Sequence, residues 1–296
     1  GGRDFSNLSV GNPVILPQVE ELWRDCNAQL LASQEYGEVV CRYGSSQGYT
    51  PLVTAIIDDF NQRYKLSLNP RNVLITPGSQ SLFFYAVNAF GGCVIFSRPC
   101  NPTGNVLSDG EVNRILAMTG VNEVPVLVDS AYACPYPALN FTEMKPVFGK
   151  NIVHCMSLSK AGLPGERIGI AVGDEKIIQV LESFQTNACI HASRYGQAIA
   201  ARAISSGALV DISEQIIRPF YQDKFTVLES ALDKYMPTEL PWFLHRGEGT
   251  IFAWLWLKDL PISDWDFYQQ LKLLGVIVVP GSIFFPGLRD NWEHKN

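Results

Sequence analysis

The chain has 296 residues, of which 47% are hydrophobic, and this predicts one large or two modest globular domains. Its net charge of −6 gives no electrostatic reason to expect nucleic acid or an anionic membrane as a partner. Seven cysteines without a C-x-x-C pair, no apolar run long enough to cross a membrane and no visible signal peptide lead us to expect a cytoplasmic protein.

Short apolar runs alternate with helical patterns between residues 72 and 172. The helical patterns cover 79–90, 108–118 and the residues from 175 onward. Because the apolar runs are continuous, they predict strands buried on both faces of a doubly wound, mostly parallel α/β sheet. The runs are NVLIT (72–76), CVIFS (93–97), VPVLVD (124–129), NIVHCM (151–156) and RIGIAV (167–172).

The C-terminal part has a different pattern, which predicts a smaller α+β domain. We expect the N-terminal 40 residues to pack against it. The predicted division is a large domain over 42–209 and a small domain formed by 1–41 and 210–296. The predicted elements of the C-terminal part are a long helix over 210–236, a strand over 249–257, a helix over 263–275 and a strand over 276–281.

Ligands bind beyond the carboxyl ends of the strands in such sheets. Polar residues follow four of the predicted strands, so their loops are expected to converge on one edge of the sheet. These residues are Ser79 and Gln80 after Gly78, Asn101, Asp129, and Ser157 with Lys160.

The segment SLSKAGLPGERIG (157–169) places Lys160 directly after a buried strand. Desolvation there favours the neutral amine, which can form a Schiff base with an aldehyde cofactor. Ser157, Ser159 and Arg167 could then hold a phosphate. The alternative is a surface lysine in a flexible turn.

The other candidates each have an ordinary structural alternative. Asp129 could keep a pyridine nitrogen protonated, or it could cap the following turn. Tyr132 could hydrogen-bond a phenolic oxygen, or it could be a packed aromatic residue. Asn101 lies in the turn sequence N-P-T-G, which fixes its amide as a donor and is also common in plain turns. Ser79 could start a phosphate-binding helix or serve as an ordinary N-cap.

Taken together and in this order, these motifs resemble the fold-type-I pyridoxal-phosphate aminotransferases. Within that family the chain is most similar to the valine–pyruvate aminotransferase group. The segments that carry the narrower resemblance are SRPCNPTGNV, CMSLSKAGLPGERIGI, IIRPFY, GTIFAWLWLKDLPI and VPGSIFFPGL.

The resemblance implies pyridoxal 5′-phosphate as cofactor and no metal. It implies that Lys160 is the Schiff-base lysine and the general acid and base. It also implies that Asp129 pairs with the pyridinium nitrogen, and that Asn101 and Tyr132 bind the phenolic oxygen. The phosphate ligands that it implies are Ser79, Gln80, Ser157, Ser159 and Arg167.

The resemblance further implies a homodimer, because Tyr43 matches a tyrosine that reaches the phosphate from the partner subunit. The alternative for Tyr43 is a packed loop aromatic. Gly11, Asn12 and Asn101 are implied to lie near the substrate carboxylate.

Two features of the family have no match. The family places an aromatic residue over the cofactor ring, several tens of residues before N-P-T-G, but only 21 residues separate Gln80 from Asn101. The family also has a carboxylate-clamping arginine near the C-terminus, and Arg289 does not match its context. The sequence therefore predicts further residues between Gly91 and Gly92 in the natural polypeptide. The alternative is a continuous βαβ unit from 72 to 97.

The leading functional hypothesis is transfer of an amino group between an apolar amino acid, of the valine or alanine type, and a 2-oxo acid such as pyruvate. One alternative is another reaction on the same cofactor, such as a β-elimination by a C–S lyase. The other is a ligand-sensing regulator without turnover. Such a regulator is expected to carry a DNA-binding domain, which this acidic sequence does not reveal.

Overall fold

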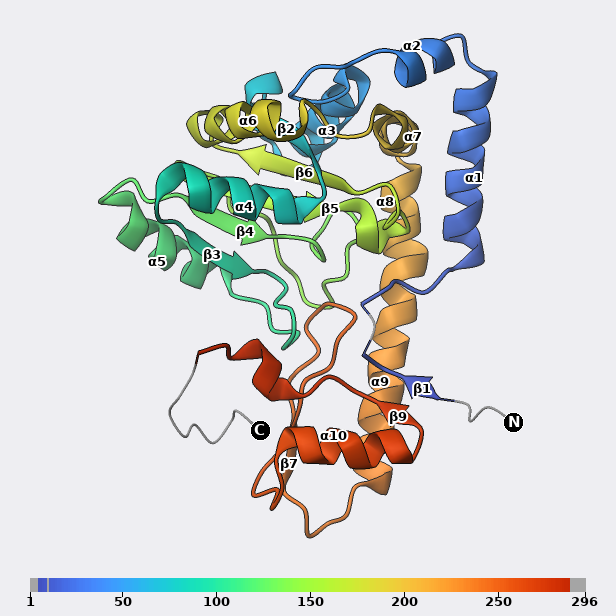
Figure 1. Cartoon of the computed structure of the whole chain (residues 1–296), viewed down its shortest axis with the longest axis vertical. Helices are drawn as coiled ribbons and strands as arrows, with labels where there is room; N and C mark the ends of the chain where they lie inside the picture. Colours follow the sequence, from blue (N-terminus) through green and yellow to red (C-terminus); the bar gives the residue numbers. More distant parts are fainter. Residues whose placement is uncertain (1–4, 10, 288–296) are drawn as a thin grey trace.

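A five-stranded sheet organises the computed structural model, which describes residues 5–9 and 11–287 (Figure 1). The strands lie in the order β2-β6-β5-β4-β3. β3, β4 and β5 pair in parallel, whereas β6 is antiparallel to both of its neighbours. The mostly parallel sheet is therefore confirmed, with β6 alone reversed. The strands are β2 (Val73–Pro77), β3 (Val94–Ser97), β4 (Val126–Asp129), β5 (Ile152–Ser157) and β6 (Ile168–Gly173).

Helices cover both faces of this sheet, which explains why its strands are continuous apolar runs. One face packs Leu74, Leu127 and Val153 against α4 (Ser79–Phe90) and α6 (Glu175–Cys189). The opposite face is covered by three further helices and includes the side chains that alternate with these along the strands. The three helices are α3 (Thr50–Tyr64), α5 (Asp109–Gly120) and α7 (Arg194–Ser205).

The N-terminal residues contact both parts of the molecule. β1 (Ser6–Asn7) pairs in parallel with β9 (Val276–Ile277), as expected for packing against the C-terminal part. α1 (Pro17–Ala32), however, contributes Trp23 and Leu30 to the same buried cluster as α3 and α7, and α2 (Tyr36–Cys41) follows it. The division into 42–209 and 1–41 with 210–296 stays a prediction.

The C-terminal part is joined to the sheet layer by a long helical segment (Figure 1). The predicted helix over 210–236 is present as α8 (Ala208–Ile212), a π-helical turn (Ser213–Ile217) and α9 (Arg218–Tyr235). α10 (Asp264–Leu273) confirms the next predicted helix. Short 3₁₀ turns cover Pro70–Asn72, Leu158–Ala161 and Gly281–Phe284.

The predicted strand over 249–257 is wrong over 249–254. Only β8 (Leu255–Leu257) is a strand, and it pairs with β7 (Trp242–Leu244). Thr250 has a φ of 74°, which interrupts extended backbone, and Gly249 instead bridges to Asn140 beside the sheet layer. The predicted strand over 276–281 shortens to the two residues of β9.

The link between α4 and β3 is short. α4 has the predicted bounds, Gly91 ends it in the left-handed conformation with a φ of 63°, and β3 begins at Val94. β2 and β3 lie at opposite ends of the sheet, so the short link does not form a βαβ unit of neighbouring strands, and further residues between Gly91 and Gly92 stay a prediction.

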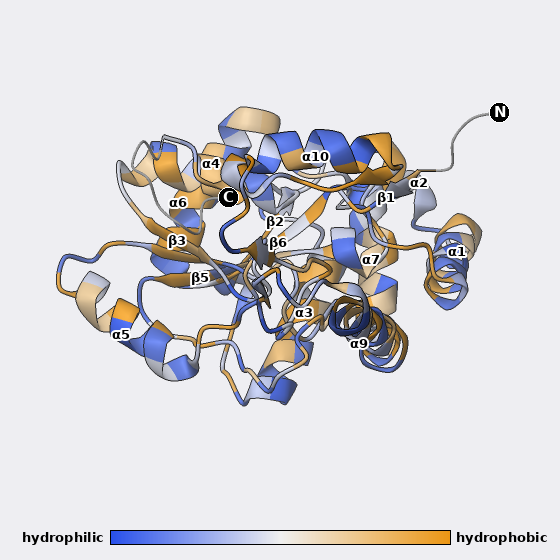
Figure 2. Cartoon of the chain, turned by 90° about the horizontal axis from the view of Figure 1, so that it is seen from below, coloured by the Kyte–Doolittle hydropathy of each residue, from blue (hydrophilic) through white to orange (hydrophobic). Residues whose placement is uncertain are grey.

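Side-chain polarity follows the packing of the helices. Figure 2 shows hydrophilic and hydrophobic bands along α5 and α10, whereas β3 and β5 are mainly hydrophobic. Within residues 5–9 and 11–287, no helix has both the length and the apolar character that crossing a membrane requires.

Candidate active site

Lys160 lies in the 3₁₀ turn that follows β5 at the edge of the sheet. Ser157 starts the turn: its hydroxyl accepts a hydrogen bond from the Ser159 amide (3.2 Å) and donates one to the Ser159 hydroxyl (2.9 Å). The half-buried Lys160 amine donates to the carbonyl oxygen of Gly11. Burial, and then the positive charge of Arg167, lower the pKa of Lys160 and so favour its neutral form.

α1 supports this turn from outside the sheet. The indole Nε1 of Trp23 donates to the carbonyl oxygen of Ala161 at 2.9 Å. A Cβ atom on Gly162 would lie 2.4 Å from Val19 and 2.9 Å from the Trp23 nitrogen, so α1 packs directly on the turn. The sequence did not single out Trp23, because no local motif joins α1 to the lysine segment.

An anion cradle forms beside Lys160 at the start of α4. Arg167 donates to the Ser159 hydroxyl at 3.1 Å, and its guanidinium lies against Gly78, where a Cβ atom would be 2.5 Å from Nη2. A Cβ atom on Gly169 would be 2.6 Å from the Ser79 nitrogen. A guanidinium, a hydroxyl and a helix N-terminus are therefore adjacent, which suits a phosphate. Gln80 is exposed on the same helical turn.

The reversed direction of β6 explains why the cradle assembles. Arg167 precedes β6, and Ser157 ends β5, so the antiparallel pairing of these strands brings both residues to one edge. Gly78 follows β2 at the same edge, because Thr76 of β2 pairs with Gly169 of β6.

Asp129 ends β4 at this edge, in register with Ser97 and Cys155 on the neighbouring strands. Its carboxylate accepts a hydrogen bond from the Ala131 amide at 3.1 Å. Burial raises the pKa of Asp129, and that amide opposes the effect. A largely buried carboxylate without a cationic partner among the described residues suits a positively charged ligand atom.

Two aromatic residues and one glycine lie around the Lys160 amine. The Tyr132 ring is buried and its centroid lies 5.9 Å from Lys160 Nζ. Phe252 packs edge-on against Tyr132 with the ring centroids 6.1 Å apart. A Cβ atom on Gly11 would lie 3.4 Å from Phe252 and 3.7 Å from Nζ. The sequence did not identify Phe252, because its segment was predicted to be a regular strand.

The remaining predicted residues differ in their positions. Asn101 is exposed in the turn that starts beside Asp129, and its amide donates to the Ser97 hydroxyl at 3.4 Å. Asn12 is exposed next to Gly11. Tyr43 is 83% exposed, and its ring contacts His191. Arg289 lies outside the described residues.

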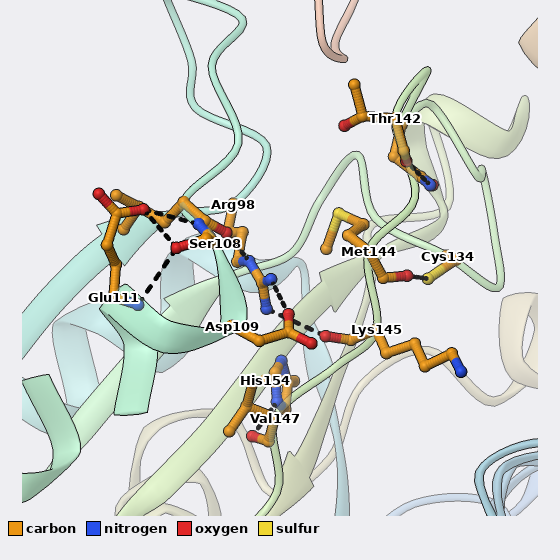
Figure 3. A network of polar contacts seen from close by, with 12 residues as sticks. Arg98, Ser108, Asp109, Glu111, Cys134, Thr142, Met144, Lys145, Val147 and His154 are labelled. Atoms are coloured by element: carbon orange, nitrogen blue, oxygen red, sulfur yellow. Dashed lines mark hydrogen bonds and ion pairs between the residues drawn. The ribbon is translucent and has the colours of Figure 1, made fainter. Parts of the chain in front are cut away.

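His154 on β5 forms buried polar contacts with Val147 (Figure 3) and with Ser130, the residue after Asp129. Its Nε2 lies 2.9 Å from the Val147 carbonyl oxygen, which can only accept, so Nε2 carries the proton. Nδ1 then accepts from the Ser130 hydroxyl at 3.2 Å, one residue after Asp129. Burial, with a smaller effect of the Arg98 charge, lowers the pKa of His154 to about 4, so the ring is neutral at pH 7.

Comparison with known proteins gives a family match and close structural neighbours. Residues 88–289 match the family model of aminotransferase class I and II. The valine–pyruvate aminotransferase of Escherichia coli K12 is 32% identical over 351 residues, covering 98% of this chain and 84% of that protein. Because the chain has 296 residues, part of that alignment consists of residues for which it has no counterpart.

Two solved structures have the same fold. The crystal structure of valine–pyruvate aminotransferase from Salmonella typhimurium LT2 superposes with a TM-score of 0.89 at 31% identity, covering 97% of this chain and 88% of its own. A putative amino-acid aminotransferase from Psychrobacter arcticum 273-4 gives a TM-score of 0.93 at 28% identity, with coverages of 100% and 86%.

Proposed function

The chain belongs to the aminotransferase class I and II family, and on this basis we propose that it transfers the amino group of valine or a similar apolar amino acid to pyruvate. The observation that supports this most strongly is the half-buried Lys160 amine, which lies between the Arg167–Ser159 cradle and the Tyr132–Phe252 pair. An amine of lowered pKa next to an anion cradle is what an aldehyde cofactor with a phosphate requires.

Pyridoxal 5′-phosphate is the cofactor of this family, and its aldehyde and electron-accepting ring supply the chemistry when it is bound. The residues present fit it. Lys160 would hold the aldehyde carbon. Asp129 would pair with the ring nitrogen, which accounts for a buried carboxylate that has no cationic partner within residues 5–9 and 11–287. Asn101 and Tyr132 would contact the phenolic oxygen. The phosphate would be held by Ser79, Gln80, Ser157, Ser159 and Arg167.

Lys160 then has a second role as acid and base. Its Nζ would accept the proton from the α-carbon of the substrate and then donate it to the cofactor. The lowered pKa of Lys160 favours the neutral amine, which this step requires. Tyr132 and Phe252, which exclude water on one side of the amine, make proton exchange with solvent less favourable.

The substrate would approach past Gly11 and Asn12, with Asn101 near its carboxylate. Phe252 supports an apolar side chain in the substrate, because its ring is beside Gly11 and extends the apolar surface of Tyr132 towards the amine. This contact supports the proposed valine-type donor over a charged one.

We also propose that the enzyme is a cytoplasmic homodimer in which Tyr43 contacts the cofactor of the partner subunit. Arg194 donates to the carbonyl oxygens of Glu38, Arg42 and Tyr43, so the exposed tyrosine is held on an ordered segment. A symmetric dimer is the commonest assembly. Sedimentation at micromolar concentration should give a dimer, and a fully active monomer would contradict this proposal.

A single-turnover experiment tests the proposed reaction. The protein loaded with pyridoxal phosphate is mixed with valine, without an acceptor, and visible absorbance and the 2-oxo acid of valine are followed. We expect loss of the cofactor's visible absorbance with formation of one equivalent of 2-oxo acid, and recovery of the absorbance on adding pyruvate. Release of ammonia from a substrate with a β-leaving group, without that recovery, would indicate elimination. Binding without either product would indicate a sensor.

A further inference from the structure

The side chain of Arg98 is almost completely buried, and Figure 3 shows its guanidinium beside Asp109. All three nitrogens of its guanidinium have a partner. Nε donates to the carbonyl oxygen of Leu107 at 2.6 Å, Nη1 donates to the carbonyl oxygen of Lys145 at 3.0 Å, and Nη2 forms an ion pair with Asp109. Only 2% of the Arg98 side chain is exposed, whereas that of its partner Asp109 is 55% exposed.

These contacts join the two ends of one turn. The turn begins at Arg98, whose amide donates to the carbonyl oxygen of Asp129 at 2.8 Å, and it ends at Leu107, whose carbonyl accepts from the Arg98 guanidinium. Within it, the Cys100 amide donates to Asn105 and the Gly104 amide donates to Cys100, both at 2.8 Å. The Arg98 side chain therefore joins the two ends of the Asn101 segment, and Glu248 holds the same segment through the Val106 amide and the Gly104 carbonyl.

Burying this charge is costly, because an ion loses several kcal/mol of hydration in a protein interior. A half-exposed Asp109 restores only part of that loss, since an exposed partner is screened by water. Two carbonyl oxygens and one carboxylate in different directions match the rigid fork of arginine, which a lysine ammonium cannot reproduce. An arginine at position 98 is therefore suited to holding these three acceptors in a fixed arrangement.

A second set of hydrogen bonds connects the region around Arg98 to Ser130, the residue that follows Asp129. Arg98 holds the carbonyl of Lys145, and His154 holds the carbonyl of Val147 in the same segment. His154 in turn contacts Ser130, which follows Asp129. Figure 3 shows the Lys145 side chain pointing away from this network, so its main chain alone takes part.

We propose that Arg98 is a positioning residue for the cofactor site, whose buried guanidinium fixes the Asn101 turn against the end of β4 where Asp129 lies. The inference rests on the proposed function in one respect, because Asn101 is taken to contact the cofactor. The effect of the Arg98 contacts on the turn does not depend on that assumption and can be measured without cofactor.

The test compares Arg98→Lys with Arg202→Lys. Arg202 is a matched control, since its side chain is also largely buried, pairs with a half-exposed Glu35 and donates to the Ala198 carbonyl, but it lies on α7 away from the site. Hydrogen exchange of the Cys100 and Gly104 amides in cofactor-free protein is the first measurement. Arg98→Lys should speed their exchange about tenfold, and Arg202→Lys should leave them unchanged.

Titration with pyridoxal phosphate is the second measurement. Arg98→Lys should weaken binding about tenfold and raise the pH midpoint of the cofactor's visible absorbance change, because the phenolic oxygen loses a well-placed donor. Arg202→Lys should lower the melting temperature without changing either value. A role of Arg98 in general stability alone would give the two variants the same pattern.

Wild-type exchange at Cys100 and Gly104 in Arg98→Lys, or equal acceleration in Arg202→Lys, would overturn the proposal. If Arg98→Lys does not fold, Asp109→Asn replaces it, because Asp109 is exposed enough for the fold to persist. This variant should still speed exchange at Gly104 more than Arg202→Lys does. Equal exchange rates in the two variants would contradict the proposal that Arg98 fixes the turn. If wild-type protein binds no pyridoxal phosphate, the proposed function fails, while the exchange rates still decide the role of Arg98.

Discussion

The indole nitrogen of Trp23 and the carbonyl oxygen of Ala161 form a 2.9 Å hydrogen bond between residues that are 138 positions apart in the chain. Ala161 directly follows Lys160, so this bond ties α1 to the turn that presents the amine. Because Trp23 is buried, the Ala161 carbonyl has no water to replace the indole as donor.

Trp23→Phe should therefore destabilise the turn while keeping most of the apolar volume. We expect a loss of about 1–3 kcal/mol in the free energy of unfolding, because a buried acceptor is left without a donor. Reaction of Lys160 with pyridoxal phosphate should also slow. Urea unfolding and absorbance titration measure the two effects. Trp265→Phe on the exposed face of α10 is the control, and equal effects of the two substitutions would rule out a specific role for Trp23.

Lys160→Ala should abolish transamination while pyridoxal phosphate is still bound noncovalently. The Arg167–Ser159 cradle and Asp129 do not depend on the amine, so binding remains, but no group is left to bond the aldehyde or move the proton. Turnover with valine and pyruvate, and retention of cofactor on gel filtration, are the measurements. Near-normal turnover would refute the assignment of Lys160.

Asp129→Asn should lower turnover far more than Asp129→Glu, by about a hundredfold or more, because only a carboxylate stabilises the positive charge on the ring nitrogen. In the cofactor-free protein, by contrast, we expect Asp129→Asn to increase stability. Burial raises the folded-state pKa of Asp129, so its ionised form costs stability above the pKa of the unfolded chain, and Asn removes that cost. Asp129→Asn should thus melt at a higher temperature without cofactor at pH 7. A lower melting temperature with unchanged turnover would contradict both statements.

His154 should make the protein less stable in mild acid. Its pKa of about 4 in the folded state lies below the ordinary value of 6.5, so the unfolded chain binds the proton first as the pH falls. Stability is full above pH 6.5 and decreases towards pH 4, by up to about 3 kcal/mol from this residue. His154→Gln, which can still donate to Val147, should flatten the decrease. Urea unfolding at several pH values tests this, and parallel curves for the two proteins would exclude His154 as the cause.

The parts of the structure that the sequence predicts well are those decided locally. α4 has its predicted bounds because Gly78 and Gly91, both with positive φ, stand at its two ends. Lys160 is delivered to the sheet edge because the buried run before it is a strand with the expected position. Residues that follow such strands are placed by the sheet itself, so their convergence is predictable.

The parts that the sequence misses depend on contacts between distant segments. The segment 249–254 has a strand-like composition, but a Cβ atom on Gly249 would lie 2.6 Å from Pro99 and 2.7 Å from the Leu139 carbonyl, so packing on the sheet layer sets its path. Trp23 and Phe252 reach Lys160 across the chain without any local motif. The position of Tyr43 in a dimer depends on a second chain, and its role stays a prediction.

Among the described residues, β3 is the strand at one end of the five-stranded sheet. The Val94 and Arg98 amides donate towards the β4 side, so the alternation of a strand turns the backbone groups of Ile95 and Ser97 outward. The Ile95 side chain is also exposed. An open strand edge of this kind is a template for pairing with another chain. We therefore expect β3 to limit the solubility of the folded protein, and a lysine at position 95 to raise the concentration at which it aggregates.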